Sequence, residues 1–337
     1  MNKVSVVILN YNGERLLKQF LPSVVDYTPN ATIIVVDNGS TDQSLAVLKN
    51  FPSVEVIQLE KNFGFCGGYN VALRKINTPY YVLLNSDIEV TQGWLEPIIR
   101  LLESRPDIAA VQPKILSFHA KDQFEYAGAG GGFIDALGYP FCRGRIFNYT
   151  EKDHGQYNDT SEVFWASGAC LVIRSEVYHA LGGLDETFFA HMEEIDLCWK
   201  IHRMGKKVYY YGESTVFHVG AGTLSRTNPR KTYYNFRNGL SLIYKHLPSN
   251  QLWYKLPFRI MLDITAALKF ILEGHGKDGI AVLKALIDFL KVISSTHKQR
   301  EKIRSRYPFS TQNVFKGLII VDYYLRGKKV IDVKSPK

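Results

Sequence analysis

Short apolar runs alternate with amphipathic stretches through the first 115 residues. The apolar runs are rich in β-branched residues and too short for helices, so they predict buried strands at residues 4–9, 32–36, 54–59, 80–84 and 109–116. Apolar residues at helical spacing predict helices between them at 13–27, 40–50 (with Ser40 as its N-cap), 67–76 and 92–104. This alternation indicates an α/β, Rossmann-like fold with a mostly parallel sheet and helices on both faces.

The remainder of the chain departs from this alternation. Residues 117–162 are rich in Gly, Asp and aromatic residues, and we interpret them as loop and short hairpin. Strands are predicted again at 163–174, 207–211 and 214–218, and helices at 175–181 and 193–204. From residue 229 the pattern is helical, which divides the chain into an α/β domain of residues 1–228 and a helical C-terminal region of residues 229–337.

Composition narrows the class of protein. An apolar share of 46% with 22% charged residues excludes a disordered chain. The cysteines form no CxxC pair, which argues against a zinc ribbon or disulfide scaffold and fits a reducing cytoplasm. No secretory signal is recognisable, and no segment reaches the ~20 apolar residues of a membrane-spanning helix.

The formal net charge of +9 is unevenly distributed. Residues 1–220 hold 19 basic and 25 acidic side chains, whereas residues 221–337 hold 22 basic and 7 acidic ones. The basic C-terminal third is expected to meet something anionic, which leaves nucleic acid, phosphates and a lipid surface open.

Polar residues directly follow several predicted strands, at the sheet edge where ligands bind in such folds. Asp37, in VVDNGSTD, suits a ribose or base, although an Asx turn explains it equally well. Gly64, in KNFGFCGGYN, precedes a helix whose N–H groups suit a phosphate, but the segment is not a dinucleotide fingerprint. Asp87, in LLNSDIEV, suits a divalent cation or a helix cap.

A second set of candidates lies further along the chain. Glu193, Glu194 and Asp196 crowd the first turn of a predicted helix, which fits either a general base or a favourable interaction with the helix dipole. His218 ends a predicted strand, where a metal ligand is a plausible alternative to a structural histidine.

Seven segments in fixed order resemble the inverting glycosyltransferases of family 2, in particular the bacterial branch with rhamnosyltransferases and galactofuranosyltransferases. They are SVVILNYNG, VVDNGSTD, NFGFCGGYN, LLNSD, GACLVIRSEVYHALGGLDETFF, EEIDLCWKIHRMGKKV and FHVGAGT. The resemblance covers residues 3–247 and implies a GT-A fold. It also implies Mg²⁺ or Mn²⁺ and a nucleotide-sugar donor, dTDP-rhamnose or a UDP-sugar.

The resemblance assigns roles to individual residues. Glu194 corresponds to the catalytic base, usually Asp in the family, with Glu193 as the competing candidate. Asn85-Ser86-Asp87 stands at the family's DxD motif with Asn replacing the first Asp, which leaves Asp87 and His218 as metal ligands. The remaining donor-site residues implied are Asn10, Asn12, Asp37, Asn62 and Gly64, and the acceptor is bordered by Trp165, Gly168 and Ala169.

Two helices are predicted in the basic C-terminal third, at 253–273 and 277–298. Each is apolar over most of its circumference with a narrow, mainly cationic stripe; in the first helix the stripe includes Arg259 and Asp263. This pattern fits a helix lying in the interface of an anionic membrane, or packing against the catalytic domain or a second subunit in a homodimer.

The family resemblance implies an acceptor glycan linked to a polyprenyl diphosphate, in cell-surface polysaccharide synthesis. The enzyme is then cytoplasmic and peripheral on the inner face of the cytoplasmic membrane. Four residues of the connecting helix are expected either to meet the lipid diphosphate or to pack in the core: Tyr233, Tyr234, Arg237 and Asn238.

Two other classes of function were weighed against an enzyme. A nucleic-acid-binding protein is disfavoured because the C-terminal aromatic residues lie opposite the charges rather than among them. A catalytically weak relative that serves as a glycan-binding, nucleotide-sugar-binding or scaffold subunit is suggested by Asn85 and Glu194, which both depart from the family pattern.

Overall fold

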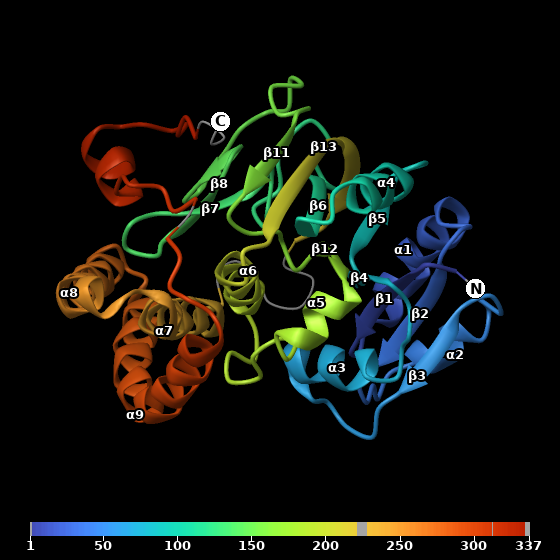
Figure 1. The fold of residues 1–337 in the computed structure, drawn as a ribbon, viewed down its shortest axis with the longest axis horizontal. Coiled ribbons are helices and arrows are strands. Elements are labelled where there is room, and N and C mark those ends of the chain that lie inside the picture. The colour runs from blue at the N-terminus through green and yellow to red at the C-terminus, as the bar shows by residue number, and fades with distance from the viewer. Residues whose placement is uncertain (1, 221–227, 312, 334–337) are drawn as a thin grey trace.

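The computed structural model describes residues 2–220, 228–311 and 313–333. Within them the chain forms a nine-stranded mixed sheet in the order β11-β13-β6-β12-β4-β1-β2-β3, with β5 paired to β13 (Figure 1). Ala221, Gly222 and Thr223 of the FHVGAGT segment lie outside the described residues.

The N-terminal half of the sheet is parallel, as predicted. Its strands are β1 (Val4–Asn10), β2 (Thr32–Asp37), β3 (Glu55–Gln58) and β4 (Tyr80–Asn85). Alternate side chains of β1 enter two different cores, because successive residues of a strand point to opposite faces. Val6 and Ile8 join the cluster under α1 (Glu14–Tyr27), and Val7 joins the cluster under α3 (Gly64–Leu73).

One predicted helix is shorter than expected at its start. α2 comprises Ser44–Leu48, so Ser40 is not its N-cap. The hydroxyl of Ser40 instead accepts a hydrogen bond from the backbone N–H of Asn12 at 2.9 Å. The prediction was wrong because Ser40 serves a contact with the loop after β1, which local sequence does not reveal.

In the second half of the sheet, the strand boundaries differ from those predicted. It contains β5 (Ile88–Val90), β6 (Ile108–Ser117), β11 (Thr160–Val163), β12 (Cys170–Arg174) and β13 (Lys207–His218), with α4 (Glu96–Ser104) and α5 (Ser175–Ala180). Of the strand predicted at 163–174, only Val163, the last residue of β11, and Cys170–Arg174, which is β12, are extended strand, and residues 164–169 between them are not. The strands predicted at 207–211 and 214–218 are one strand, β13, with a register shift between Tyr211 and Thr215.

A second, four-stranded sheet lies within the segment interpreted as loop and hairpin. Its strands are β7 (Gly132–Ile134), β8 (Pro140–Cys142), β9 (Arg145–Ile146) and β10 (Tyr149–Thr150). Gly132 allows β7 to approach the segment between β11 and β12, since a Cβ there would lie 2.1 Å from the Trp165 ring.

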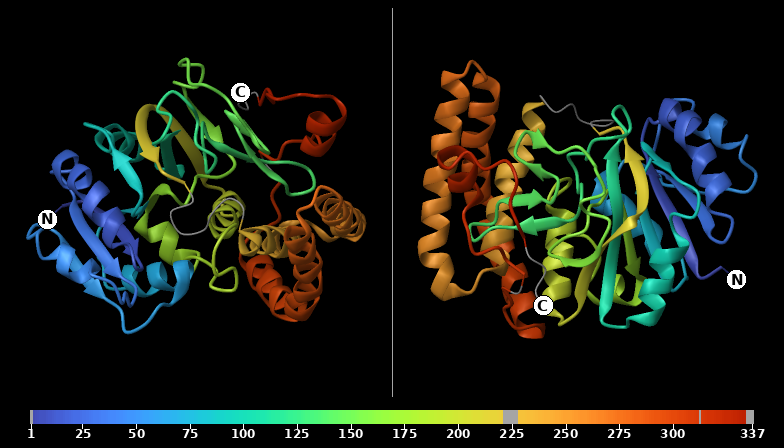
Figure 2. Two further views of the ribbon diagram at one scale, coloured as in Figure 1. Left: turned by 180° about the vertical axis from the view of Figure 1, so that it is seen from behind. Right: turned by 90° about the horizontal axis from the view of Figure 1, so that it is seen from above.

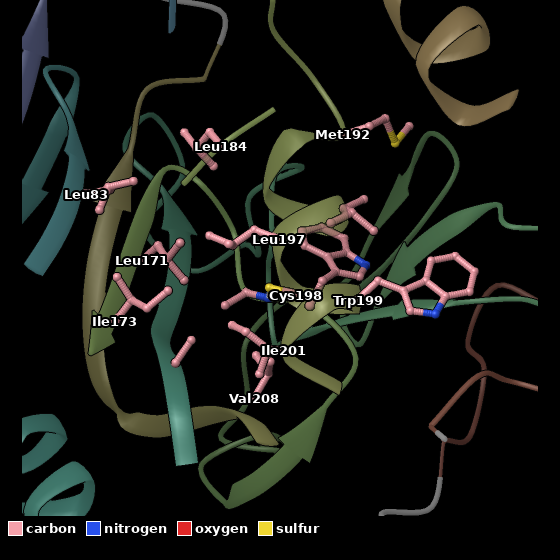
Figure 3. Packing of buried hydrophobic residues seen from close by; sticks show 14 of the residues in the cluster. Leu83, Leu171, Ile173, Leu184, Met192, Leu197, Cys198, Trp199, Ile201 and Val208 are labelled. Atoms are coloured by element: carbon pink, nitrogen blue, oxygen red, sulfur yellow. Dashed lines mark hydrogen bonds between the residues drawn. The ribbon is translucent and has the colours of Figure 1, made fainter. Parts of the chain in front are cut away.

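The helix α6 (Glu193–Arg203) carries the candidate base at its N-terminus and is buried along its length. Leu83, Leu171 and Ile173 point from the sheet toward Leu197 and Ile201 of this helix (Figure 3). Packing of this kind holds the helix N-terminus in a defined position relative to the sheet.

The C-terminal region is helical, as predicted. It comprises α7 (Pro229–His246), α8 (Ser249–Leu272), α9 (Gly276–Arg306) and a short π-helix, η1 (Val321–Leu325). The hydrophobic core continues across residue 229, because Leu240, Phe289 and Ile319 belong to the same cluster as the sheet residues. α8 and α9 form an outer layer at one side of the molecule (Figure 2). Within the described residues, no helix combines the length and apolar character needed to cross a bilayer.

Candidate active site

Two polar side chains meet at the ends of β1 and β2, where Asn10 and Asp37 are paired in register. Both are fully buried. Asp37 accepts hydrogen bonds from the side-chain amide of Asn10 at 3.3 Å and from the backbone N–H of Ser40 at 3.1 Å. Asn12 accepts from the N–H of Thr41 at 2.8 Å, which joins the loops that follow the two strands.

The loop after β3 is attached to the same edge by Asn38. Its side-chain amide donates to Asn62 Oδ1 at 3.1 Å and to the Gly64 carbonyl at 3.0 Å. Gly39 lies under this loop with a φ of +75°, and a Cβ there would be 2.8 Å from backbone atoms of Lys61. Asn10, Asn12, Asp37, Asn62 and Gly64 therefore lie around one edge of the sheet.

The predicted metal ligands Asp87 and His218 are adjacent, and a third residue completes their arrangement. His218 Nε2 lies 3.2 Å from Asp87 Oδ1, and His218 Nδ1 lies 3.0 Å from Glu125 Oε2. All three side chains are buried. Burial disfavours the charged imidazole, but Asp87 and Glu125 outweigh it and raise the pKa of His218 to about 10.

This donor set fits a divalent cation bound together with a substrate. Across residues 2–220, 228–311 and 313–333, no three His, Cys, Asp or Glu side chains form a complete metal cage. Mg²⁺ and related ions commonly take one or two carboxylates and fill their remaining positions with water and substrate phosphates. A metal-binding histidine also usually donates its second ring N–H to a carboxylate, as His218 is placed to do toward Glu125.

The backbone connects the Asn85-Ser86-Asp87 turn to the candidate base. The N–H of Asn85 donates to the Ala169 carbonyl at 3.0 Å. The neighbouring residue, Gly168, faces α6, since a Cβ at Gly168 would lie 3.7 Å from Glu194 Cβ. The structure therefore brings Gly168 and Ala169 between the metal-motif turn and Glu194.

Two adjacent carboxyl groups begin α6 and differ in exposure. Glu193 is buried, and desolvation followed by repulsion from Glu194 holds its pKa well above the usual range. Glu194 is half-buried, and desolvation raises its pKa to about 7. One side-chain oxygen of each is buried without a hydrogen-bond partner among the described residues.

The loop before α6 has an unusual backbone. Phe189, His191 and Met192 have φ values of 65°, 67° and 73°, in the left-handed region that non-glycine residues rarely adopt. Asn238 of α7 is completely buried and compensates for this, because its amide donates to the carbonyls of Phe188, Ala190 and His191 at 2.8–3.0 Å. We regard Asn238 as a positioning residue for the start of α6.

Aromatic rings connect the loop before α6 to the edge of the sheet where the donor is expected to bind. The ring of Phe189 stacks on Tyr234 with centroids 5.6 Å apart, and a Cβ at Gly64 would lie 2.9 Å from Phe189. Phe189 is 49% exposed, so this stack borders solvent at the site. Tyr234 thus lies beside the loops expected to hold the donor.

A buried ionic cluster secures α6 against α7. Asp196 pairs with Lys200 and Lys245 at 2.6 Å and with His246 at 2.8 Å, and Lys245 also reaches Asp185. Burial raises the pKa of Asp196, but these partners outweigh it and hold the pKa well below its usual range. Of the three acidic residues in the first turn of α6, Asp196 is therefore structural.

Residues 5–182 match the family described as "Glycosyl transferase family 2". The chain belongs to this family. It is 26% identical over 228 residues to an O-antigen biosynthesis protein of Myxococcus xanthus, covering 64% of this chain and only 17% of that relative. It is 24% identical to an N-acetylglucosaminyl-diphospho-decaprenol L-rhamnosyltransferase of Mycobacterium tuberculosis, covering 66% of this chain and 77% of the relative.

Among solved structures, GalNAc-T7 with UDP, GalNAc and Mn²⁺ superposes with a TM-score of 0.58 at 17% identity. The match covers 92% of this chain and 58% of that one. This likeness confirms the predicted GT-A fold.

One site prediction made for this family 2 chain was wrong. Trp165 is buried in the core and donates its indole N–H to the Phe133 carbonyl at 2.8 Å, so it has no surface with which to border an acceptor. Arg237 is half-buried and donates to the carbonyls of Thr187 and Phe188, so it holds the loop before α6, and its contact with an acceptor stays a prediction. Both roles depend on contacts with distant segments.

Sequence reasoning also missed Glu125, Asn38 and Phe189. Glu125 lies in a segment without hydrophobic periodicity and becomes relevant only through its contact with His218. Asn38 and Phe189 stand inside the recognised family segments, which was the available signal for both.

Proposed function

We propose that this family 2 protein is a metal-dependent inverting glycosyltransferase. In this proposal it transfers a sugar from dTDP-rhamnose or a UDP-sugar to a hydroxyl of a lipid-linked glycan. The observation that carries the proposal is the arrangement of Asp87, backed by His218 and Glu125, across Gly168–Ala169 from Glu194. A site for phosphate-bound metal and a base with a pKa near neutrality are the two requirements of this reaction.

The donor lies along the ends of β1, β2 and β4 in this proposal. Asn12 and the loop at Asn62 and Gly64 line the nucleoside pocket, and the fully buried Asn10 and Asp37 hold the loops after β1 and β2 that surround it. Asp87 and His218 hold Mg²⁺ or Mn²⁺, which when bound stabilises negative charge on the departing diphosphate.

Glu194 takes the proton of the acceptor hydroxyl. As the acceptor oxygen forms its bond to the sugar C1, the bond from C1 to the diphosphate oxygen breaks, and its electron pair leaves with the nucleoside diphosphate. A single in-line displacement inverts the anomeric centre and needs no covalent intermediate. Glu193 is the poorer candidate for the base, because it is more deeply buried than Glu194, and desolvation followed by repulsion from Glu194 raises its pKa well above the usual range.

The lipid-linked acceptor is supported by the name of the Mycobacterium relative, whose substrate is attached to a diphospho-decaprenol. Tyr234, stacked on Phe189 beside the site, is placed to border this acceptor.

A screen of nucleotide sugars by thermal shift with Mn²⁺ tests the proposal. A true donor at ~100 times its dissociation constant stabilises the protein by about 2.7 kcal/mol. The stabilising sugar nucleotide is then incubated with the protein, and release of nucleoside diphosphate is measured. Binding of a donor without hydrolysis or transfer would favour the weakly catalytic binding or scaffold subunit instead.

A further inference from the structure

Two charged residues in the middle of α8 face the protein. Arg259 and Asp263 are 3% and 0% exposed and form an ion pair at 2.9 Å. Arg259 also donates to the Leu137 carbonyl at 3.0 Å, and Asp263 accepts from the Tyr139 hydroxyl at 2.9 Å. This part of the polar stripe therefore binds the turn between β7 and β8.

The opposite side of α8 is apolar and exposed. Trp253 and Leu272, near its two ends, are 74% and 87% exposed. Between them the exposed apolar side chains recur at helical spacing, and they include Met261, Ile264, Leu268 and Ile271.

The neighbouring helix α9 extends this surface. Its exposed apolar residues are Ile280, Leu283, Ile287 and Leu290, spaced three or four apart so that they form one stripe. We call the exposed apolar residues of α8 and α9 together the outer face. Figure 2 shows the two helices as a layer at the edge of the molecule, away from most of the main sheet. A contiguous apolar surface of this kind marks an interaction site.

The charged residues beside the outer face indicate the kind of partner that it binds. Lys277, Lys284, Lys291 and Lys298 recur every seven residues along α9 and are all exposed, so they form a cationic stripe beside the apolar one. At the end of α8, Lys269 lies 5.6 Å from the Tyr324 ring of η1, whereas Arg326 and Lys328 pair with Asp322 and leave Lys329 as the further cation there.

Over the described residues 249–306, the helix pair α8 and α9 has no free acidic side chains to match these lysines. Every carboxylate between residues 249 and 306 is either buried or bonded to a neighbour: Asp263 to Arg259, Glu273 to Lys269, Asp278 to Thr232, Asp288 to Lys291, and Glu301 to Arg304. A second copy of the chain would oppose lysines to lysines, whereas anionic lipid headgroups complement them.

We propose that the outer face is a membrane-docking surface that lies in the headgroup region of an anionic bilayer. The apolar side chains of α8 and α9 enter the boundary with the acyl chains, and the α9 lysines contact lipid phosphates. This arrangement explains why α8 turns Arg259 and Asp263 inward. It does not depend on the sugar, the metal or the catalytic base.

Vesicle flotation of the full chain tests the proposal. We expect it to float with vesicles containing about 30% phosphatidylglycerol and much less with pure phosphatidylcholine, and to be released by salt. Replacing Lys277 and Lys298 by Gln should weaken partitioning about fivefold per lysine.

Apolar variants separate docking from unfolding. The double variant Leu268→Glu/Ile287→Glu should abolish flotation, whereas Val56→Glu, an exposed apolar residue on β3, should not. Circular dichroism checks that both variants are folded.

Failure of the unaltered chain to float would overturn the proposal, as would equal flotation of the double variant. A concentration-dependent dimer that this double variant dissociates, seen by light scattering without flotation, would assign the outer face to a second copy instead.

Discussion

His218 Nε2 lies 3.2 Å from Asp87 Oδ1, which joins the end of β13 to the turn after β4. The other ring nitrogen of His218 lies 3.0 Å from Glu125. An imidazole with one nitrogen on a carboxylate and the other beside a metal-motif Asp is oriented as a metal ligand requires.

The first prediction concerns this group of three residues. Glu125→Gln should weaken Mn²⁺ binding about 10- to 100-fold, because it removes the carboxylate that orients His218 without removing a ligand. His218→Gln and Asp87→Asn should reduce the Mn²⁺ affinity further, because each removes a proposed ligand. Calorimetric titration of nucleoside diphosphate with and without Mn²⁺ measures this effect, and the metal-free affinity serves as the internal control. The assignment would be contradicted if Mn²⁺ increased nucleoside diphosphate affinity in all three variants as much as in the unaltered chain.

The second prediction concerns the pH dependence of turnover. The pKa of Glu194 is raised to about 7 by burial, and only its deprotonated form accepts a proton. We therefore expect kcat to rise with pH up to about 7 and then level off. Glu194→Gln should cut kcat at least ~100-fold while donor affinity stays unchanged. A variant with near-normal kcat, or with the same pH profile, would show that another group is the base.

The third prediction concerns Asn238 and the loop before α6. Asn238→Ala removes the donor that satisfies three loop carbonyls, so we expect a loss of about 1–3 kcal/mol in the free energy of unfolding. Because the loop leads into Glu194, kcat should also fall while the donor dissociation constant remains similar. Urea denaturation and steady-state kinetics measure the two effects. Asn250→Ala, an exposed substitution at the start of α8, is the matched control.

The fourth prediction compares two glycines with similar backbone angles. Gly39 and Gly93 have φ values of +75° and +71°, so alanine strains both. A Cβ at Gly39 would lie 2.8 Å from the Lys61 backbone, whereas a Cβ at Gly93 would meet nothing within 4 Å. Gly39→Ala should thus lower both the melting temperature and nucleotide affinity, while Gly93→Ala lowers only the melting temperature, and less. Equal nucleotide affinity in the two variants would argue against the placement of the donor at this loop.

Much of the fold was predictable because its signals are local. The parallel strands β1, β2 and β4 are continuous apolar runs, and they place Asp37 and Asp87 at the same sheet edge. The division of the predicted strand 163–174 into β11 and β12 was not predictable. Residues 164–169 between them are as apolar as a strand, and their path is set by packing against β7 and α6.

From the amino-acid sequence alone follow the family, the positions of β1, β2 and β4, and most of the residues at the polar ends of these strands. These features follow from hydrophobic periodicity and from the spacing of residues within motifs, which are local properties of the chain. Folding alone reveals that Glu125 supports His218, that Asn238 secures the loop before Glu194, and that Arg259 and Asp263 of α8 face inward. Each of these depends on contacts between segments far apart in the chain, so their physical cause appears only when the chain is folded.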